Sequence, residues 1–381
     1  MAIKIENLPF YWRLKEKGSP NIVPDFRPFE FDFDEGLQMV IQKREQQTLD
    51  YLEEIYKAEY NIGYLQDINE IARPYGKDFI DFIKRVLGNW GSHVKNVLEV
   101  GCGGCTILEL LAKDGYSVLG VDPSPIAVRE GAKKGIRVIN DVFPTLQHTQ
   151  KADLIFHSDV QEHVSDPVTF LANQKKQLSE HGLIIISLPD CNESIGRGDV
   201  SMIIHQHLNY FDNESLKNTV EAAGLEVLTI ETAQYGGSLY CCARNKPSNN
   251  YSSKSGKEKF VSFLKEVDNA SSKVSAVFKD VLSDKNKTVG FYVPLRTLPY
   301  LSLINNFEGF RFFDDTKHWH DRAFDGTEIY IENFNDLRNN PVTDLYIMSL
   351  TFGDVIKSKV MNGIQGIETV KTLSELLESA L

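Results

Sequence analysis

The chain has 381 residues, 42% of them hydrophobic and 25% charged, and its net charge at pH 7 is −12. A chain of this length usually exceeds one hydrophobic core, so we expect two or three domains. The composition is ordinary for a globular protein, and no apolar run is long enough to predict a transmembrane helix. The acidic balance argues against nucleic acid as the main partner, because phosphate backbones are bound by clustered Lys and Arg.

The N-terminus and the cysteines predict a cytoplasmic protein. The first residues lack the apolar core of a signal peptide, and five cysteines are an odd number, which favours reduced thiols. Cys102 and Cys105 form a C-x-x-C, a pattern found in halves of zinc sites and in redox pairs. No second cysteine pair follows at zinc spacing, so we predict no metal site.

The first 75 residues are predicted to form an N-terminal arm with helices. Residues 1–35 are rich in proline and aromatic residues and look extended. Residues 36–70 carry apolar side chains at helical spacing and predict a helix. Strands and helices then alternate, which predicts a doubly wound parallel sheet in an α/β domain. The predicted order is helix 77–90, strand 96–100, helix 106–115, strand 117–122, helix 125–135, strand 153–159, helix 167–182 and strand 183–190.

A change of pattern marks the end of this domain. Residues 224–233 and 238–245 predict an antiparallel hairpin, and the polar stretch 247–259 predicts a linker. A long helix follows to about residue 283, and from residue 287 the α/β pattern begins again. The predicted parts are therefore an arm (1–75), a first α/β domain (76–246), a linker with a helix (247–285) and a smaller Rossmann-like domain (286–381).

The stretch VLEVGCGGC, residues 97–105, indicates a ligand-binding turn at the end of the first strand. Gly101 and Gly103 permit positive φ and let a ligand approach the backbone, and the following helix N-terminus favours negative groups. The second strand ends at Asp122, where a carboxylate can accept from both hydroxyls of a ribose. Glu99 would repel a pyrophosphate but suits a cationic ligand. A dinucleotide turn is the alternative, although Thr106 stands where its fingerprint has Gly or Ala.

The E-x-G-x-G pattern resembles the first motif of class I methyltransferases, which implies S-adenosylmethionine as the cofactor. Asp141 and Val142 resemble the segment that contacts adenine. Ser158 and Asp159 lie in HSDVQEHVSDP, which resembles the motif near the methionine end. Tyr60, with its neighbours Tyr56 and Tyr64, either covers the cofactor or belongs to an aromatic stripe on the core.

The segment HQHLNYF, residues 205–211, is the candidate for acceptor chemistry. It follows a loop at the carboxyl ends of the strands, where open α/β sheets bind ligands. Together with YGGSLY, residues 235–240, and the second α/β domain, it resembles sugar C-methyltransferases that act on nucleotide-linked 4-keto-deoxysugars. This resemblance implies His207 as general base and His205 as a neighbouring polar group.

The chain also departs from that family. Gln206 stands where the family has a glutamate, no cysteine-rich module precedes Cys102, and Pro294-Leu295-Arg296 replaces a glycine-rich turn in the last domain. The predicted function is methyl transfer from S-adenosylmethionine to a small molecule, a sugar or nucleotide-linked sugar. The alternatives are an O-methyltransferase of a saccharide or small metabolite, with a metal at Asp159 and Glu162, and a non-catalytic binding protein.

Overall fold

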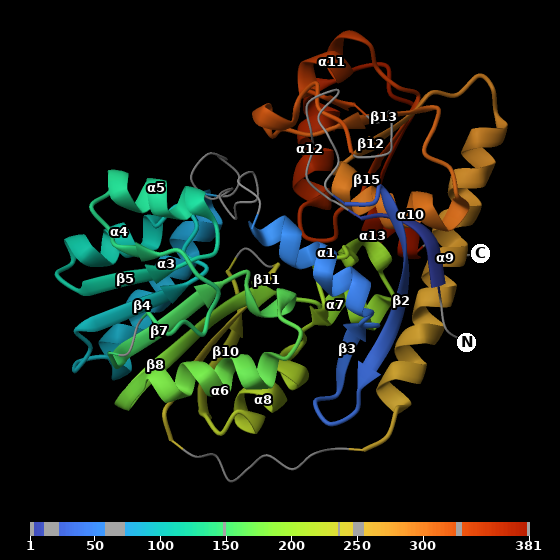
Figure 1. The fold of residues 1–381 in the computed structure, drawn as a ribbon. Helices are drawn as coiled ribbons and strands as arrows, with labels where there is room; N and C mark the ends of the chain where they lie inside the picture. The colour runs from blue at the N-terminus through green and yellow to red at the C-terminus, as the bar shows by residue number, and fades with distance from the viewer. Residues whose placement is uncertain are drawn as a thin grey trace. The chain divides into compact units, whose positions relative to one another are not determined.

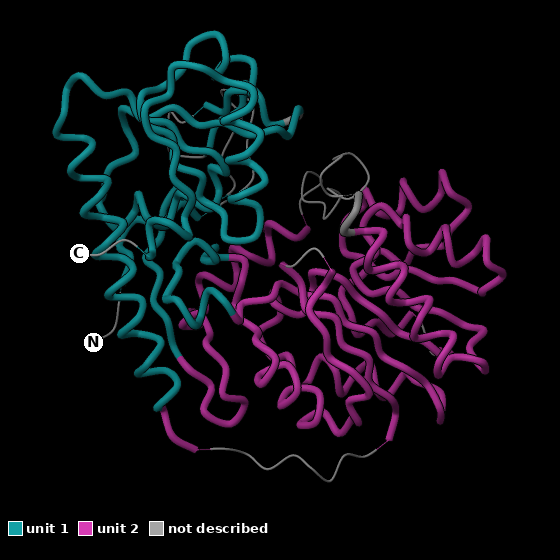
Figure 2. Tube along the Cα trace, turned by 180° about the vertical axis from the view of Figure 1, so that it is seen from behind, with its two compact units in different colours: residues 1–32, 193–205, 258–381 teal, residues 33–192, 206–257 magenta. Residues whose placement is uncertain are grey.

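The structure is a computed structural model that describes residues 4–10, 23–57, 73–147, 150–234, 237–246, 255–324 and 330–378. The chain divides into two compact units that interleave in sequence, as Figure 2 shows. Unit 1 comprises residues 1–32, 193–205 and 258–381, and unit 2 comprises residues 33–192 and 206–257.

Unit 2 is built on a seven-stranded sheet with the order β10-β11-β8-β7-β4-β5-β6 (Figure 1). The strands β8, β7, β4, β5 and β6 run parallel, and β11 joins antiparallel to β8 and β10. The predicted parallel sheet and its terminal hairpin are both confirmed. The strands are β4 (Asn96–Val100), β5 (Ser117–Val121), β6 (Val138–Ile139), β7 (Ala152–Ser158), β8 (Leu178–Pro189), β10 (Glu226–Thr232) and β11 (Ser238–Arg244).

Helices cover both faces of this sheet because its central strands are apolar on both sides. Helices α3 (Arg73–Trp90), α4 (Thr106–Lys113) and α5 (Pro125–Lys133) contribute to the core on one face. Helices α6 (Pro167–Gln177) and α8 (Asn213–Ala222) contribute to the core on the other. Both α5 and α6 begin at an N-capping side chain, Ser124 and Asp166, followed by a proline. This start is favourable because the cap satisfies an N–H that lacks a helical partner.

Two predicted helix boundaries are wrong. Residues 39–42 form strand β3 (Met39–Gln42), and helix α1 (Gln46–Lys57) begins only after it. Strand β3 pairs antiparallel with β9 (Asn209–Tyr210), so pairing with a distant segment overrides its helical spacing. The helix expected over 167–182 ends at Gln177, and residues 178–182 begin strand β8, which pairs with β7 from Ala152 onward.

Unit 1 contains a five-stranded parallel sheet with the order β14-β13-β12-β15-β16. The predicted helix before this sheet is confirmed as α9 (Glu258–Ser283). The strands are β12 (Val289–Tyr292), β13 (Phe310–Phe313), β14 (Ile331–Glu332), β15 (Asp344–Ile347) and β16 (Thr369–Thr372). The other helices are α10 (Pro294–Ile304), α11 (Phe334–Asn339), α12 (Gly353–Gly363) and α13 (Leu373–Glu378), with the short helix η3 (Lys317–Trp319).

The N-terminal segment that looks extended forms strands β1 (Lys4–Pro9) and β2 (Phe26–Asp34), which pair antiparallel. The loop before the histidine segment contains α7 (Asn192–Arg197) and η2 (Val200–Met202). Within unit 1, Tyr300 on α10 donates from its hydroxyl to Asp199 Oδ1 at 2.9 Å, and Arg296 donates to the carbonyl of Ser201 at 3.1 Å. The loop is therefore fixed to α10 by one buried and one partly buried hydrogen bond.

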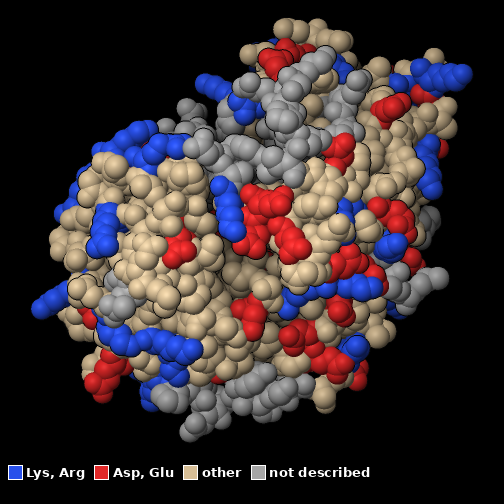
Figure 3. All heavy atoms as spheres, viewed as in Figure 1, with Lys and Arg blue, Asp and Glu red and all other residues tan. Residues whose placement is uncertain are grey.

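Figure 3 shows acidic and basic side chains interspersed over the face that it draws. Among the helices of the described residues, none combines the length and the apolar character needed to cross a bilayer.

Candidate functional site

The glycine turn between β4 and α4 is shaped by close approach of the chain after β7. Gly101 has φ of 72° and Gly103 has φ of 45°, a region that side chains other than glycine rarely adopt. A Cβ atom at Gly101 would lie 2.5 Å from Cγ2 of Val160. Position 101 therefore requires glycine for two reasons, backbone conformation and space.

Asp122, directly after β5, binds this turn. It is 8% exposed, and its Oδ2 accepts the N–H of Gly103 at 2.9 Å while Oδ1 accepts the N–H of Ser124 at 2.8 Å. Burial raises the pKa of Asp122, against the lowering effect of these two bonds. Each carboxylate oxygen has a second lone pair, so Asp122 can order the turn and still accept from a ligand hydroxyl.

Glu99 and the two cysteines lie beside the same turn. Glu99 is 5% exposed, on β4, and Cys102 and Cys105 are buried thiols whose sulfur atoms lie 3.7 Å apart. The contact with Cys105 and burial raise the pKa of Cys102, and the nearby negative charge of Glu99 adds to this effect. Both thiols belong to the core cluster that packs α3 and α4 on the sheet.

The segment after β6 carries the residues predicted to contact an adenine. Asp141 Oδ2 accepts from Thr145 Oγ1 at 2.6 Å and its Oδ1 from the N–H of Val142 at 2.8 Å. These bonds lower the pKa of Asp141. Val142 is 53% exposed, an unusual position for valine. Asn140 ties this segment to the end of β5 by donating to the carbonyls of Asp122 and Pro123.

The segment after β7 brings further predicted residues to the same edge of the sheet. Ser158 ends β7, and its hydroxyl donates to Asp159 Oδ2 at 3.2 Å. Asp159 has φ of 54°, so the chain bends sharply toward Val160 and the glycine turn. Tyr60 and Tyr64 lie outside the described residues, whereas the ring of Tyr56 on α1 lies 5.7 Å from that of His163.

The two candidate histidines have different environments. His205 belongs to unit 1, is 1% exposed, and lies 4.9 Å from the ring of Phe10 and 5.9 Å from that of Phe29. Its Nε2 lies 3.3 Å from the carbonyl oxygen of Arg27, and burial lowers the pKa of His205 to about 4. This environment is that of a neutral core histidine.

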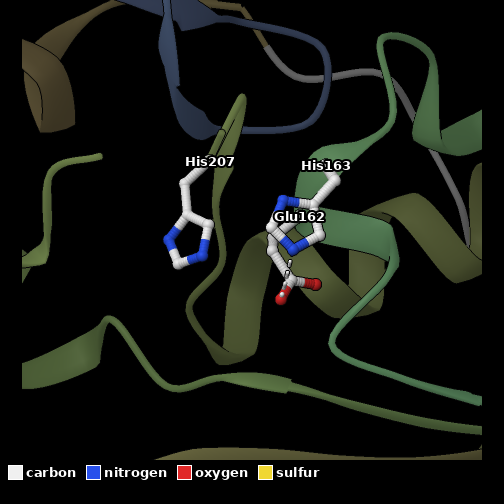
Figure 4. Close-up of side chains that lie close together, drawn as sticks. All are labelled: Glu162, His163 and His207. Carbon is white, nitrogen blue, oxygen red and sulfur yellow. Dashed lines mark ion pairs between the residues drawn. The ribbon is translucent and has the colours of Figure 1, made fainter. Parts of the chain in front are cut away.

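His207 belongs to unit 2 and lies in a cluster with Glu162 and His163, whose ligand atoms are within 4.8 Å of one another. Figure 4 shows the two imidazoles and the carboxylate directed toward one small volume. No local sequence pattern predicts that Glu162 and His163 lie beside His207, whereas the structure brings the three together. His157, on β7, is fully buried against Phe170, and burial lowers its pKa to about 3.

Backbone and amide hydrogen bonds hold this cluster together. The N–H of Leu208 donates to the carbonyl of Glu162 at 2.8 Å, and the amide of Asn209 donates to the carbonyl of Val164 at 2.8 Å. His163 Nδ1 lies 2.7 Å from the carbonyl oxygen of Gln206. The short helix η1 (Gln161–His163) and the strand β9 are thereby joined, which brings His207 beside Glu162.

From the sequence, His163 was a possible metal ligand with no visible convergence on a second histidine. Its only signal was an adjacent Glu-His pair soon after a strand, and the partner that gives this pair meaning lies 44 residues further on. That distance is closed by the pairing of β3 with β9 and by the bonds of Asn209, which no local pattern encodes.

Comparison with known proteins agrees with this geometry. Residues 70–230 match the sequence profile of a family described as "Methyltransferase domain". Unit 2 therefore has the Rossmann-like class I methyltransferase fold, as the sequence predicted.

The relatives that match are methyltransferases of several kinds. The ubiquinone biosynthesis O-methyltransferase of Actinobacillus pleuropneumoniae serotype 7 is 31% identical over 129 residues, which cover 31% of this chain and 53% of that protein. The C-methyltransferase NovU of Streptomyces niveus is 27% identical over 150 residues, covering 38% of this chain and 36% of NovU. The chain thus spans about half the length of the first of these relatives and about a third of the second.

Solved structures resemble the chain more distantly. The 1,6-didemethyltoxoflavin-N1-methyltransferase of Burkholderia thailandensis, with bound S-adenosylhomocysteine, aligns with a TM-score of 0.40 at 15% identity. The alignment covers 55% of this chain and 96% of that methyltransferase.

Proposed function

We propose that unit 2 binds S-adenosylmethionine at the glycine turn and transfers its methyl group to a small molecule. The observation that carries this proposal is the bond from the N–H of Gly103 to Asp122. It places the backbone of the turn against a buried carboxylate at the carboxyl ends of β4 and β5. Parallel α/β sheets bind ligands at these ends, and the carboxylate has lone pairs left for ribose hydroxyls.

In this proposal Glu99 and residues after β6 and at the end of β7 bind the remaining parts of the cofactor. Glu99 supplies a buried negative charge, which suits the ammonium and sulfonium of S-adenosylmethionine. Asp141 accepts from the amino group of the adenine, and the exposed side chain of Val142 packs on its ring. Ser158 and Asp159 lie toward the methionine end.

The acceptor in this proposal is a sugar or a nucleotide-linked sugar, methylated at carbon. The likeness of HQHLNYF and YGGSLY to sugar C-methyltransferases supports it, as does the similarity to a C-methyltransferase. His207 accepts the proton that an adjacent ketone acidifies, and the resulting carbanion attacks the methyl carbon while the carbon–sulfur bond breaks. His207 directly precedes Leu208, whose N–H donates to the carbonyl of Glu162 in η1. Val160, just before η1, lies against Gly101, so the base stands near the cofactor turn.

Incubation with labelled S-adenosylmethionine and a panel of 4-keto sugar nucleotides tests this proposal. NMR of the product should place the label on carbon. The variant His207→Ala should bind S-adenosylhomocysteine like the wild type and lose transfer, whereas the exposed His181→Ala should retain both. Label on no acceptor, with cofactor binding intact, would contradict the proposed activity.

The geometry of the Glu162–His163–His207 cluster favours a second candidate, O-methylation assisted by a metal. Glu162, His163 and His207 would hold the ion, which would make an acceptor hydroxyl more acidic and orient its oxygen. The hydroxyl proton would pass to solvent, the oxygen would bond to the methyl carbon, and the sulfonium would leave as a neutral thioether. Activity that is abolished by a chelator and restored by a divalent cation, with the label on oxygen, would support this candidate over carbon methylation.

A further inference from the structure

The carboxylate of Glu162 is buried, and the negative charge of a buried carboxylate is ordinarily balanced by a cation or by hydrogen-bond donors. The residue is 1% exposed, and among the residues that the structure describes neither of its oxygens has a hydrogen-bond partner. Its one ionic contact within the described part of the chain is Nε2 of His163, 3.5 Å from Oε1. Burial and the charge of Asp159 raise the pKa of Glu162 well above its usual range. A buried carboxylate is costly unless a cation or donors satisfy it.

The orientation of the His163 ring increases the need for a cation or a proton beside Glu162. Its Nδ1 is 2.7 Å from the carbonyl oxygen of Gln206, and a carbonyl can only accept, so Nδ1 carries the hydrogen. In the neutral imidazole, Nε2 is then an acceptor, and it faces the acceptor Oε1 of Glu162. Two acceptors face each other favourably only when a proton or a metal ion lies between them. A backbone carbonyl bound to the other ring nitrogen is also the usual support of a metal-binding histidine.

His207 completes a set of three groups. Its ring lies 5.1 Å from that of His163, and the three ligand atoms lie within 4.8 Å of one another. The imidazoles are partly exposed, 21% for the side chain of His163, so a cation and a second ligand can reach them. Two imidazoles and a carboxylate, with positions left open, suit zinc, cobalt, manganese or iron in the divalent state.

We propose that Glu162, His163 and His207 bind one divalent transition-metal ion, which leaves positions open for an oxygen of the acceptor. The ion-binding part of this proposal stands on the cluster alone. The part that assigns the open positions to an acceptor oxygen rests on the second proposed reaction, metal-assisted O-methylation, in which His207 is a metal ligand and not the general base. Asn209 holds the segment of His207 against η1 and acts as a positioning residue.

Titration of the metal-free full chain with Co²⁺, followed by calorimetry and visible absorption, tests the site. We expect one Co²⁺ per chain, with a ligand-field spectrum typical of nitrogen and oxygen ligands. Glu162→Gln and His207→Gln should each weaken Co²⁺ binding at least about 10-fold. Loss of a residue that only supports a metal ligand already costs about 10–100-fold in affinity, and loss of a ligand should cost no less. The exposed His181→Gln should bind like the wild type; His181 lies 6.3 Å from His93 and controls for binding by other histidine pairs.

The stability of the variants separates metal binding from a structural role. Glu162→Gln retains the side-chain volume and removes a buried carboxylate, so it should melt no lower than the metal-free wild type and lose the rise in Tm that Co²⁺ produces. Absence of Co²⁺ binding in wild-type protein that binds S-adenosylhomocysteine would overturn the metal site alone. Equal Co²⁺ affinity in wild type, Glu162→Gln and His207→Gln would overturn it too. Failure to bind S-adenosylhomocysteine would instead contradict the proposed function, whatever Co²⁺ does.

Discussion

The two units use the same turn at the start of their sheets with different residues. In unit 2 the N–H of Gly101 donates to the carbonyl of Val121 at 2.8 Å, and in unit 1 the N–H of Val293 donates to that of Phe313 at 3.2 Å. The φ angles are 72° at Gly101 and 66° at Val293. In each unit the residue after the first strand of the turn thus donates to the last residue of the second strand, with a similar positive φ.

The aspartate after the second strand is also shared. Asp122 accepts the N–H of Ser124 at 2.8 Å, and Asp314 accepts the N–H of Thr316 at 2.8 Å. Burial raises the pKa of both carboxyl groups. The parallel strands β6-β5-β4-β7-β8 and β14-β13-β12-β15-β16 therefore share one order, which occurs twice in this chain.

The turns differ in what they leave accessible. Unit 2 has glycines, and Gly103 donates its N–H to Asp122. Unit 1 has Val293 in a strained conformation and then Pro294, which has no N–H to offer. The fold therefore supplies the position of a candidate site, and the residues of one turn decide whether a ligand can approach it.

Exchanging the turn residues should have the largest effect. Gly101→Val introduces into unit 2 the residue that unit 1 carries, but its Cβ would lie 2.5 Å from Val160. Strain of this kind costs about 1–3 kcal/mol before the clash is counted, so we expect measurable destabilisation and loss of S-adenosylhomocysteine binding. Calorimetry and thermal unfolding check both. The reverse change, Val293→Gly, should leave cofactor binding unaltered, and restored or added binding there would contradict the comparison.

Loss of the His207 imidazole should have the next largest effect. Removal of a general base typically lowers the rate about 10²–10⁴-fold. His207→Ala should therefore lower kcat in this range and keep the affinity for S-adenosylhomocysteine. His205 is enclosed by Phe10 and Phe29 in unit 1, so His205→Asn should lower stability rather than kcat of the folded protein. A fall in kcat for His205→Asn equal to that of His207→Ala would show that the two environments are misassigned.

Acid should destabilise both units through their buried histidines. Burial lowers the pKa of His205 in unit 1 to about 4 and that of His157 in unit 2 to about 3. An unfolded histidine takes up its proton near pH 6.5, so the unfolded state binds more protons below that pH and the free energy of unfolding falls as pH drops toward 4. For His205 the loss is on the order of 3 kcal/mol. Denaturant unfolding at pH 7 and pH 4.5 should show a smaller loss in His205→Asn than in wild type, whereas His181→Gln should lose as much as wild type.

The sequence predicted the strands and helices of unit 2 well where local pattern and tertiary context agree. Strand β4 is confirmed residue by residue, because an apolar run and a glycine turn bound it. The segment 39–42 was misassigned because its strand depends on pairing with β9, 170 residues away between Val40 and Tyr210. The role of Asp122 was predicted from spacing and that of Glu99 from its charge beside the glycine turn; the sheet places both residues at that turn, and their roles stay predictions. The cluster at Glu162 could not be predicted, since it depends on where Asn209 and Leu208 bond the chain after β7.

The smallest expected effect tests the comparison most directly, through the paired variants Asp122→Ala and Asp314→Ala. Asp122 is proposed to bind the ribose, and a charge-assisted hydrogen bond contributes about 1.5–3 kcal/mol, so its loss should weaken binding roughly 10–100-fold. Isothermal titration with S-adenosylhomocysteine should find one site per chain in the wild type, that loss of affinity in Asp122→Ala, and unchanged affinity in Asp314→Ala. Two sites per chain, or a loss of affinity in Asp314→Ala with Asp122→Ala unaffected, would contradict the claim that the glycine turn of unit 2 binds the cofactor.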